Sequence, residues 1–511
     1  MKLALSCAAL WLSLTLLTGC SSKIEPVDKP ESYSHNVIIK DSAVLKQYSD
    51  QATQGQGSDS GLYPLSHGEE AFVSRLSMIA AAQHSIDLQY YIYRLDETGK
   101  LLSWYLLKAA DRGVRVRLLL DDMTTGPHEK ALAALATHPN IEVRLFNPFY
   151  HRNSRWLEML GTFERTNRRM HNKSLIVDNH FTVVGGRNIG NEYFSADLAV
   201  DFGDLDLLAI GPVVHETALQ FDLYWNNDFA IPVETLVARP DNEPFLDSQQ
   251  EVDKEAQAMF EGEYFTRLKH NTLLQQIKQK QIPWVWAPAS LYYDNPEKLQ
   301  QSQEQQVDNL ASQLATWGEQ ARQEMVLISP YFVPTQFGVD RLIKLKQEQQ
   351  VEIIILTNSL ASTDVVAVHS GYQGYRKQLL AAGIQLYEVK ANPDNKPGMW
   401  SGSSRSSLHA KTFILDRHAI FIGSMNYDPR SVWLNTEMGI VVESPMLAQT
   451  LLANKAQSLD RSAYQVKLAE DGQLVWYDAV KNRYYQNEPD AGFWRRFVAS
   501  FLSMLPIEEQ L

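Results

Sequence analysis

Two short stretches of the chain carry the same reactive side chains at the same spacing. Each has a histidine, a lysine two positions later, an aspartate five positions after the lysine and an asparagine ten positions after that. The residues are His171, Lys173, Asp178 and Asn188 in the first copy and His409, Lys411, Asp416 and Asn426 in the second. A lone histidine and lysine two apart are usually just one face of a strand. Two matched copies, 238 positions apart, predict a functional site.

The side chains of each copy suit one kind of ligand, a phosphate group. An imidazole can act as nucleophile or acid, an ammonium group supplies a positive charge, and an amide supplies a neutral donor. A phosphodiester exchange needs a nucleophile on one side of phosphorus and an acid on the leaving oxygen opposite, so two motifs facing across a cleft would provide both. The lysines and asparagines can carry the developing charge, and we therefore expect neither a metal ion nor a cofactor.

The residues around each motif indicate the elements that position it. The stretch 408–416, LHAKTFILD, is rich in apolar and β-branched residues and predicts a strand. His409 and Lys411 would then share one face of that strand, and Asp416, on the other face, would fix the turn before the next strand. The small residues before each asparagine, Gly-Gly-Arg and Gly-Ser-Met, would let the backbone approach a ligand closely.

Strand and helix patterns alternate in both halves of the chain. We predict a strand, a helix and a strand at 84–93, 100–112 and 114–122, and the same series at 325–333, 338–347 and 351–359. Tyr91 and Tyr331 are 240 positions apart and Val114 and Val351 are 237 apart, close to the spacing of the motifs. The sequence thus predicts an α/β protein of two duplicated domains. Each would have a mixed, mostly parallel sheet flanked by helices, with the active site in the cleft between them.

The paired motifs resemble the signature of the phospholipase D superfamily. The stretches GSMNYDPRSVWLNTEMGIVV and DLDLLAIGPVV are similar to bacterial cardiolipin synthases of the C type, and the resemblance covers about residues 65 to 511. It implies that His171 is the nucleophile, that it forms a phosphohistidine, and that His409 is the acid and base. The symmetry of the motifs leaves the reverse assignment open. Gly186 departs from the second copy, which has Ser424 at that position.

The same resemblance points to two acidic residues downstream of the histidines. Asp204 and Glu437 lie 33 and 28 positions after the histidines of their own motifs. They resemble the acids that orient each imidazole through its second nitrogen. The alternative interpretation is that they are surface acids near the start of a strand.

The resemblance also implies an activity on phospholipids at a membrane surface. We expect a phosphatidyltransferase that makes cardiolipin from phosphatidylglycerol and a second phospholipid, which phosphatidylethanolamine could supply. The alternative is hydrolysis of phospholipids to phosphatidic acid by the same residues, with water as acceptor. Two intact motifs argue against a non-enzymatic binding protein. A net charge of −13 argues against a nuclease or other nucleic-acid partner, whose binding relies on basic residues.

The N-terminus is typical of a bacterial lipoprotein leader. Lys2 is followed by an apolar core over 3–17 that is too short for a comfortable membrane span. The residues 17–20, LTGC, resemble a lipobox, which implies cleavage after residue 19 and lipid attachment to Cys20. Ser21 then favours the outer membrane over the inner one. We expect a lipid-anchored protein of the cell envelope that faces the periplasm.

Composition divides the remainder of the chain. Residues 20–64 are polar and predict a tether, within which 35–48 could be ordered. We assign 65–250 and 306–460 to the two phospholipase D-like domains, 251–305 to an insertion between them, and 461–511 to C-terminal strands and a helix. The last helix has apolar residues near helical spacing, among them Phe493, Trp494, Phe497 and Phe501. Packing on the catalytic body is the favoured interpretation for this helix, and docking on a bilayer is the alternative.

Overall fold

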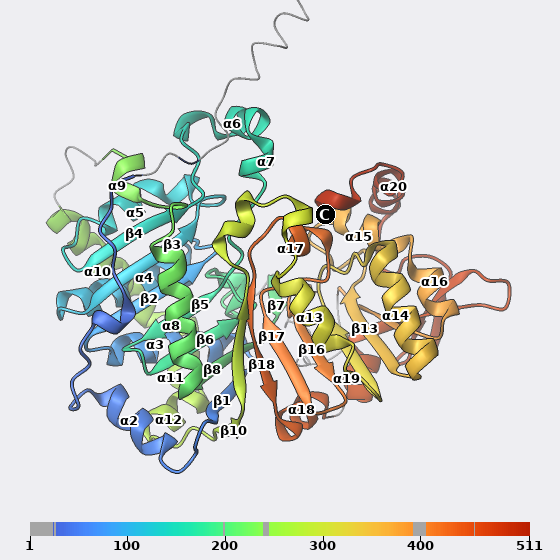
Figure 1. The fold of residues 1–511 in the computed structure, drawn as a ribbon, viewed down its shortest axis with the longest axis horizontal. Helices are drawn as coiled ribbons and strands as arrows, with labels where there is room; N and C mark the ends of the chain where they lie inside the picture. Colours follow the sequence, from blue (N-terminus) through green and yellow to red (C-terminus); the bar gives the residue numbers. More distant parts are fainter. Residues whose placement is uncertain (1–23, 25–26, 198–199, 239–244, 392–404, 454) are drawn as a thin grey trace, which may run out of the picture.

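Two large β-sheets, one from each half of the chain, lie next to each other with helices around them (Figure 1). The computed structural model describes residue 24 and residues 27–197, 200–238, 245–391, 405–453 and 455–511. The expected leader at 1–19 and the lipidation site at Cys20 lie outside these ranges. No helix within the described ranges has the length and apolar character needed to cross a membrane.

The two sheets have the same strand order. The first sheet, in spatial order, consists of β10 (Val285–Ala287), β1 (Ser60–Leu65), β8 (Asp206–Ile210), β6 (Phe181–Gly185), β5 (Ser174–Val177), β2 (Ser85–Tyr90), β3 (Arg115–Asp121), β4 (Ile141–Phe146) and β9 (Ala230–Pro232). The second consists of β11 (Ala289–Tyr293), β18 (Met438–Glu443), β17 (Ala419–Gly423), β16 (Thr412–Leu415), β12 (Glu324–Ile328), β13 (Glu352–Asn358), β14 (Gln385–Val389), β19 (Ala463–Leu468), β20 (Leu474–Asp478) and β21 (Arg483–Tyr485). Strands β1, β8, β6, β5, β2, β3 and β4 correspond in order to β11, β18, β17, β16, β12, β13 and β14. The predicted duplication of the α/β unit is confirmed.

Both sheets are mixed, as expected, but most of their strand pairs are antiparallel rather than parallel. Only β2–β3–β4 and β12–β13–β14 are parallel sets. These strands are joined by helical crossovers, whereas β5–β6 and β16–β17 are hairpins that run antiparallel. The helix patterns predict the crossovers correctly, but the hairpins within the motifs make the remaining pairings antiparallel.

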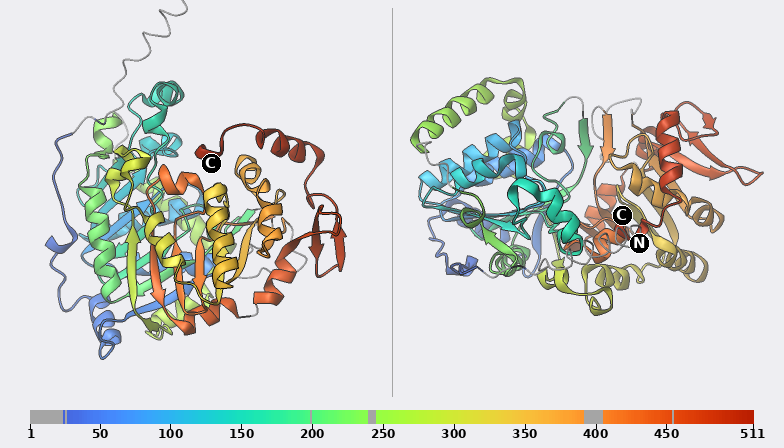
Figure 2. Two further views of the ribbon diagram at one scale, coloured as in Figure 1. Left: turned by 45° about the vertical axis from the view of Figure 1, so that its right-hand side comes forward. Right: turned by 90° about the horizontal axis from the view of Figure 1, so that it is seen from above.

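Helices cover the outer faces of the sheets (Figure 2). In the first half the longer ones are α3 (Gly68–Ala81), α4 (Glu97–Asp111), α8 (Pro212–Trp225) and α10 (Phe245–Glu261). In the second half the covering helices include α13 (Leu310–Gly318), α14 (Thr335–Gln349), α15 (Val366–Gln373), α16 (Arg376–Ala381) and α18 (Pro445–Leu452). A core of buried aliphatic side chains joins the two sheets, including Val184 and Leu207 from the first and Ile414 and Ile422 from the second. The halves therefore share a core, and each supports the position of the other.

Several segments outside the repeats belong to the folded body. Strands β10 and β11, from the segment expected to be an insertion, are edge strands of the two sheets, and β19 extends the second sheet beyond residue 461. The chain before residue 65 also contributes β1, the helix α2 (Val44–Thr53) and a segment held by the first half. The Ser34 amide donates to Asp222 at 2.7 Å, and buried Arg117 donates to the Ser34 hydroxyl at 2.8 Å. The order considered for 35–48 is present, and the expectation of a tether is wrong for the further part that includes α2 and β1.

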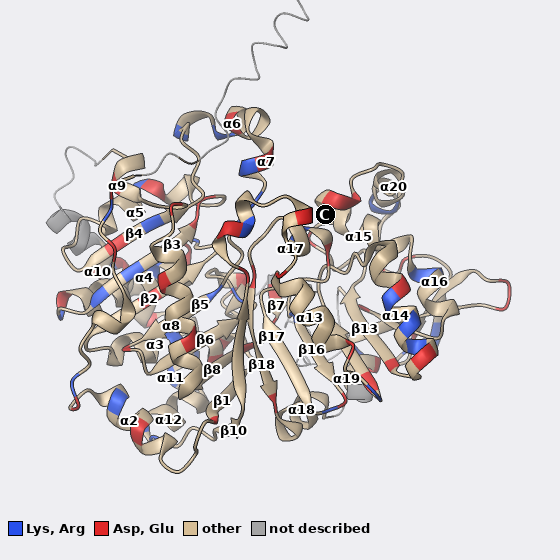
Figure 3. Ribbon diagram, viewed as in Figure 1, with Lys and Arg blue, Asp and Glu red and all other residues tan. Residues whose placement is uncertain are grey.

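Charged residues are spread over both halves, and acidic ones outnumber basic ones (Figure 3). Many of the basic residues are buried in ion pairs, such as Arg75 with Asp206 at 2.9 Å and Arg117 with Asp87 at 2.7 Å. Such pairs are consistent with buried charges being tolerated only when they are neutralised. Basic residues that are buried in ion pairs do not contribute to a surface that could bind a polyanion.

Candidate active site

The two motif histidines lie immediately before strands, where the chain of one half pairs with the chain of the other. Strands β5 and β16 begin at Ser174 and Thr412, after the motif lysines, so the expectation that each histidine is in the strand is wrong. The His171 amide instead donates to the carbonyl of Thr436 at 2.9 Å, and the His409 amide donates to that of Gly203 at 2.8 Å. Each motif is thus fixed by the half that does not contain it.

Each histidine pairs with an acid of the opposite half. Nδ1 of His171 lies 2.8 Å from a carboxylate oxygen of Glu437, and Nδ1 of His409 lies 2.6 Å from Asp204. Asp204 and Glu437 are fully buried, so the surface interpretation is wrong. The expected pairing of each acid with the histidine of its own motif is also wrong. Gly203 and Thr436 bond to the backbone of the other half's motif, so the residue after each, Asp204 or Glu437, reaches the imidazole of that motif. Nδ1 is occupied in both rings, which leaves Nε2 for chemistry.

The motif lysines lie against the histidine backbones. Lys173 Nζ donates to the carbonyl of His171 at 2.5 Å, and Lys411 Nζ donates to that of His409. Lys411 Nζ is also 3.1 Å from Nδ1 of His409, so the two side chains lie on the same side as predicted. Burial lowers the pKa of Lys173 well below its usual value and that of Lys411 to about 8. Positively charged side chains next to a buried site are suited to bind an anion.

The motif asparagines are both buried, but they have different surroundings. Asn188 accepts from the amide of Ile92 at 3.1 Å and donates to the Tyr193 hydroxyl at 3.1 Å. Asn426 is 4% exposed, and within the described parts of the chain its side-chain oxygen has no hydrogen-bond partner. An unsatisfied buried oxygen is costly unless a ligand donates to it.

The motif aspartates lie away from the imidazoles. Asp178 accepts from the amides of Gln83, His84 and Ser85, at 2.8 to 2.9 Å. Asp416 accepts in the same way from the amides of residues 322–324. Both adopt a positive φ, 47° and 51°, in the turn after the motif strand. The aspartates therefore fix this turn, as predicted, and also tie it to the start of β2 or β12.

The two acids have opposite electrostatic environments. Burial raises the pKa of Glu437 to about 7. Burial opposes ionisation of Asp204 too, but His409 and Lys411 hold the pKa of Asp204 well below its usual range. His409 therefore has a fully charged partner, and His171 has one that is only partly ionised at neutral pH.

The difference between Gly186 and Ser424 follows from these acids. Ser424 donates to Glu437 at 2.5 Å, and Ser431 donates to the other oxygen of Glu437 at 3.0 Å. A side chain at Gly186 would place its Cβ 2.2 Å from Asp204. The second half thus holds a longer acid with two serine donors, while the first half holds a shorter acid that leaves room only for glycine.

Burial and nearby positive charge also act on the histidines. Burial, then Lys173 and Lys411, lowers the pKa of His171 well below its usual value, and the charge of His409 contributes. Burial and Lys411 lower the pKa of His409, while Asp204 raises it. Since groups of the second motif act on His171, the two motifs form one site, with a neutral imidazole favoured at His171.

Aromatic residues that the sequence did not single out line the histidines. Tyr91 contacts His171 edge-on, with ring centroids 5.0 Å apart, and Tyr193 contacts His409 in the same way at 5.2 Å. Phe202 stacks on His409 at 5.5 Å. Their signal in the sequence was weak, because Tyr and Phe next to strands are common in ordinary cores.

Comparisons with known proteins agree with this geometry. The family described as "Cardiolipin synthase, PLD-like domain" matches residues 76–202 and 319–458, which include both motifs. Cardiolipin synthase C of Escherichia coli (strain K12) is 41% identical over 454 residues, or 88% of this chain and 95% of that protein. Cardiolipin synthase B of Salmonella typhimurium (strain LT2) is 25% identical over 423 residues, or 82% of this chain and 85% of that protein. The solved phosphatidylserine synthase of Haemophilus influenzae Rd KW20 shares the fold, with a TM-score of 0.57 at 14% identity over 91% of this chain and all of that one.

Proposed function

The chain belongs to the cardiolipin synthase family of phospholipase D-like enzymes, and we propose that it transfers a phosphatidyl group to the hydroxyl of phosphatidylglycerol, giving cardiolipin. The observation that carries the proposal is the pair of buried histidines, each held at Nδ1 by an acid of the opposite half. This arrangement presents one nucleophile and one acid to a single phosphodiester. The donor is a second phospholipid, either phosphatidylglycerol or phosphatidylethanolamine.

In the first step, Nε2 of His171 attacks the phosphorus of the donor lipid. The bond from phosphorus to the head-group oxygen breaks, and that oxygen takes a proton from His409. In the second step, His409 removes the proton of the acceptor hydroxyl, whose oxygen attacks phosphorus and releases His171. Lys173, Lys411, Asn188 and Asn426 stabilise the charge on the phosphoryl oxygens.

The unequal acids support this assignment over the reverse. A nucleophilic imidazole must be neutral, and the pKa of His171 is lowered strongly while its partner Glu437 has a pKa of about 7. A general acid must carry a proton, and the ionised Asp204 favours the charged form of His409. The charges thus support the assignment that the symmetry of the motifs leaves open.

The pH dependence of kcat/KM should report the His409 proton. Burial and Lys411 lower the pKa of His409, so the descending limb should lie below about 6.5, the usual value of a histidine. Asp204→Asn removes the charge that raises this pKa, and the limb should move to lower pH. The measurement is a pH profile of both proteins on one lipid substrate. A limb that stays in place in the variant would argue against His409 as the acid.

The products decide between transfer and hydrolysis. The purified protein in vesicles of phosphatidylglycerol and phosphatidylethanolamine should give mostly cardiolipin, and its yield should rise with phosphatidylglycerol content. Two lipids in one plane have a high effective concentration, which helps the acceptor compete with water. Phosphatidic acid as the main product, unchanged when phosphatidylglycerol is raised, would make the protein a hydrolase.

We propose further that the enzyme is anchored through lipid on Cys20 and faces the periplasm, in the outer membrane. The LTGC stretch supports the anchor, and Ser21 after it supports the outer membrane. Cys20→Ala should abolish incorporation of a labelled fatty acid, because it removes the thiol and the cleavage site together. Equal labelling of the variant and the unchanged protein would show that Cys20 does not carry a lipid anchor.

A further inference from the structure

Two helices at the edge of the molecule expose apolar side chains that a folded protein normally buries. On α6 (Arg155–Gly161) Trp156 is 65% and Leu160 is 73% exposed. On α20 (Phe493–Leu502) Trp494 is 73% and Phe497 is 54% exposed. Further exposed apolar residues beside them are Leu157, Phe163, Phe493, Val498, Phe501, Met504 and Leu505.

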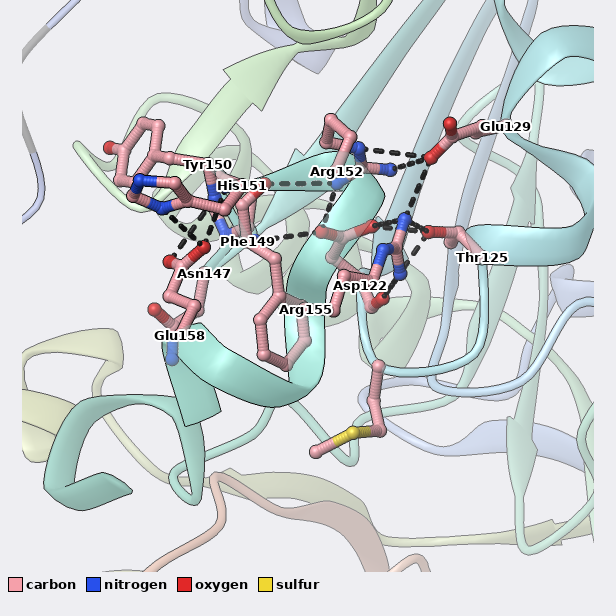
Figure 4. A network of polar contacts seen from close by, with 12 residues as sticks. Asp122, Thr125, Glu129, Asn147, Phe149, Tyr150, His151, Arg152, Arg155 and Glu158 are labelled. Atoms are coloured by element: carbon pink, nitrogen blue, oxygen red, sulfur yellow. Dashed lines mark hydrogen bonds and ion pairs between the residues drawn. The ribbon is translucent and has the colours of Figure 1, made fainter. Parts of the chain in front are cut away.

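The polarity of α6 is reversed, since its charged side chains point into the protein. Arg155 donates to Glu129 at 2.9 Å and to the carbonyl of Asp122 at 2.9 Å (Figure 4). The Glu158 carboxylate accepts from the amides of Tyr150 and His151, at 3.1 and 2.7 Å, and is 9% exposed. These bonds fix the orientation of α6 and turn Trp156 and Leu160 outward. Their exposure is therefore built into the fold.

Helix α20 has the same reversed polarity. Nε of Arg495 donates to the carbonyl of Leu360 at 2.6 Å, and its guanidinium also donates to that of Thr363. Ala499 is buried, and its carbonyl accepts from Gln373 of α15 at 3.2 Å. The expectation that the aromatic residues of this helix pack on the catalytic body is wrong, because Arg495 and Ala499 make the contact instead.

Both helices lie at the edge of the molecule where the chain leads to His171. Helix α6 follows β4, and the next helix, α7 (Phe163–Thr166), leads directly to His171. Asn167 donates to Gln510 of the C-terminal segment after α20 at 2.8 Å and accepts from Arg430 at 2.8 Å. Figure 1 shows α6, α7 and α20 along the same edge, with the C-terminus between them. The exposed residues of α6, α7 and α20 thus form one region next to the segment that precedes His171, here called the docking face.

The chemistry of the docking face fits a lipid bilayer. Helix α20 has no acidic residue, and the one acid of α6, Glu158, is buried in the network above. Tryptophan and phenylalanine on a short helix are typical of surfaces that enter the interfacial region of a membrane. A protein with a net charge of −13 is repelled by anionic lipid elsewhere on its surface, and this repulsion is weaker at the docking face, whose helices carry one exposed acid, Glu164 of α7.

We propose that the docking face inserts its aromatic and leucine side chains into the surface of a phospholipid bilayer, at the edge of the molecule where the chain leads to His171. The inference rests on the proposed function, because insertion at this edge would present lipid head groups to His171 and His409. A lipid anchor at the N-terminus does not determine which surface of the folded protein contacts the membrane, and the docking face is that surface.

The first test locates the membrane contact without any turnover. In the full chain with Cys7 and Cys20 replaced by serine, a polarity-sensitive fluorophore is attached at Leu160→Cys, Phe497→Cys or, as control, Met446→Cys. Met446 is 66% exposed on α18, at the opposite edge of the molecule (Figure 1). Vesicles of phosphatidylglycerol and phosphatidylethanolamine should raise the emission about threefold or more at the first two positions and leave the control unchanged. Equal responses at all three positions would overturn the proposal. No response at Leu160 and Phe497 would overturn it too, and is the result expected if this face binds a protein instead.

The second test separates docking from catalysis. Trp156→Ser combined with Trp494→Ser should lower turnover on vesicles by about tenfold or more, because less apolar surface enters the bilayer. Turnover of a short-chain phospholipid dissolved as monomers should be unchanged, and Met446→Ser should affect neither substrate. An equal loss on both substrates would mean that these residues support the active site and would overturn the proposal. If the unchanged protein turned over no phospholipid, the proposed function would fail, while the fluorophore result would still decide where the protein docks.

Discussion

Replacing His171 or His409 with alanine should lower phosphatidyl transfer by about four orders of magnitude. Each variant removes a group that takes part in both steps of the exchange, and residues that act as a unit show losses of this size. The two losses should be far from additive, so the double variant should be little slower than either single one. The measurement is cardiolipin formation under matched lipid and protein concentrations.

His418 provides the matched control. It lies in the turn after the second motif strand, is exposed, and has no contact with the motif histidines through its side chain. His418→Ala should keep nearly full turnover. Substantial activity in His171→Ala would mean that phosphorus is attacked by another group, and the account of the nucleophile would be wrong.

Asp204→Asn and Glu437→Gln should each lower turnover by about a thousandfold, since each acid holds the ring nitrogen opposite the reacting one. Because each acid contacts the histidine of the other motif, the two substitutions should impair different parts of the reaction. Asp204 contacts His409 at 2.6 Å, so its loss should weaken protonation of the leaving group. Glu437 contacts His171 at 2.8 Å, so its loss should weaken the attack.

A lipid substrate with a nitrophenol head group distinguishes the two cases. Nitrophenolate leaves without a proton, so Asp204→Asn should release about one equivalent of it rapidly and then stall, because His409 is also needed for the second step. Glu437→Gln should show a slow first step both with the nitrophenol lipid and with an ordinary phospholipid. A nitrophenol burst in Glu437→Gln and not in Asp204→Asn would reverse the assignment of the two histidines.

The fold could be predicted largely from the sequence, because its duplication appears twice, in the motifs and in the alternation of strands and helices. The strand and helix patterns between Ser85 and Asp121, and between Glu324 and Asn358, match the observed elements within a few residues. The sequence could not predict that antiparallel pairs outnumber parallel ones. The motifs are interpreted as sites of chemistry, and that interpretation leaves out the hairpins through which they add antiparallel strand pairs to each sheet.

The site residues were predictable as types, but their partners were not. Asp204 and Glu437 were found by resemblance, and distance along the chain placed each with the wrong histidine. Sequence separation is a poor guide where two domains exchange contacts, and the pairings of His171 with Thr436 and of His409 with Gly203 cross the domain boundary. The docking face was predicted only in part, because bilayer docking was the less favoured interpretation of the last helix and α6 was not singled out. Helical spacing of apolar residues indicates an apolar side, and only the contacts of Arg155 and Arg495 reveal that this side points outward.

The most direct test of the account is to locate the covalent intermediate. The nitrophenyl lipid is mixed with His409→Ala, the reaction is stopped at alkaline pH, where phosphohistidine survives, and the peptides are analysed by mass spectrometry. We expect a phosphatidyl group on His171, and none in His171→Ala under the same conditions. A phosphatidyl group on His409 in His171→Ala, or steady release of product with no adduct on either histidine, would contradict it.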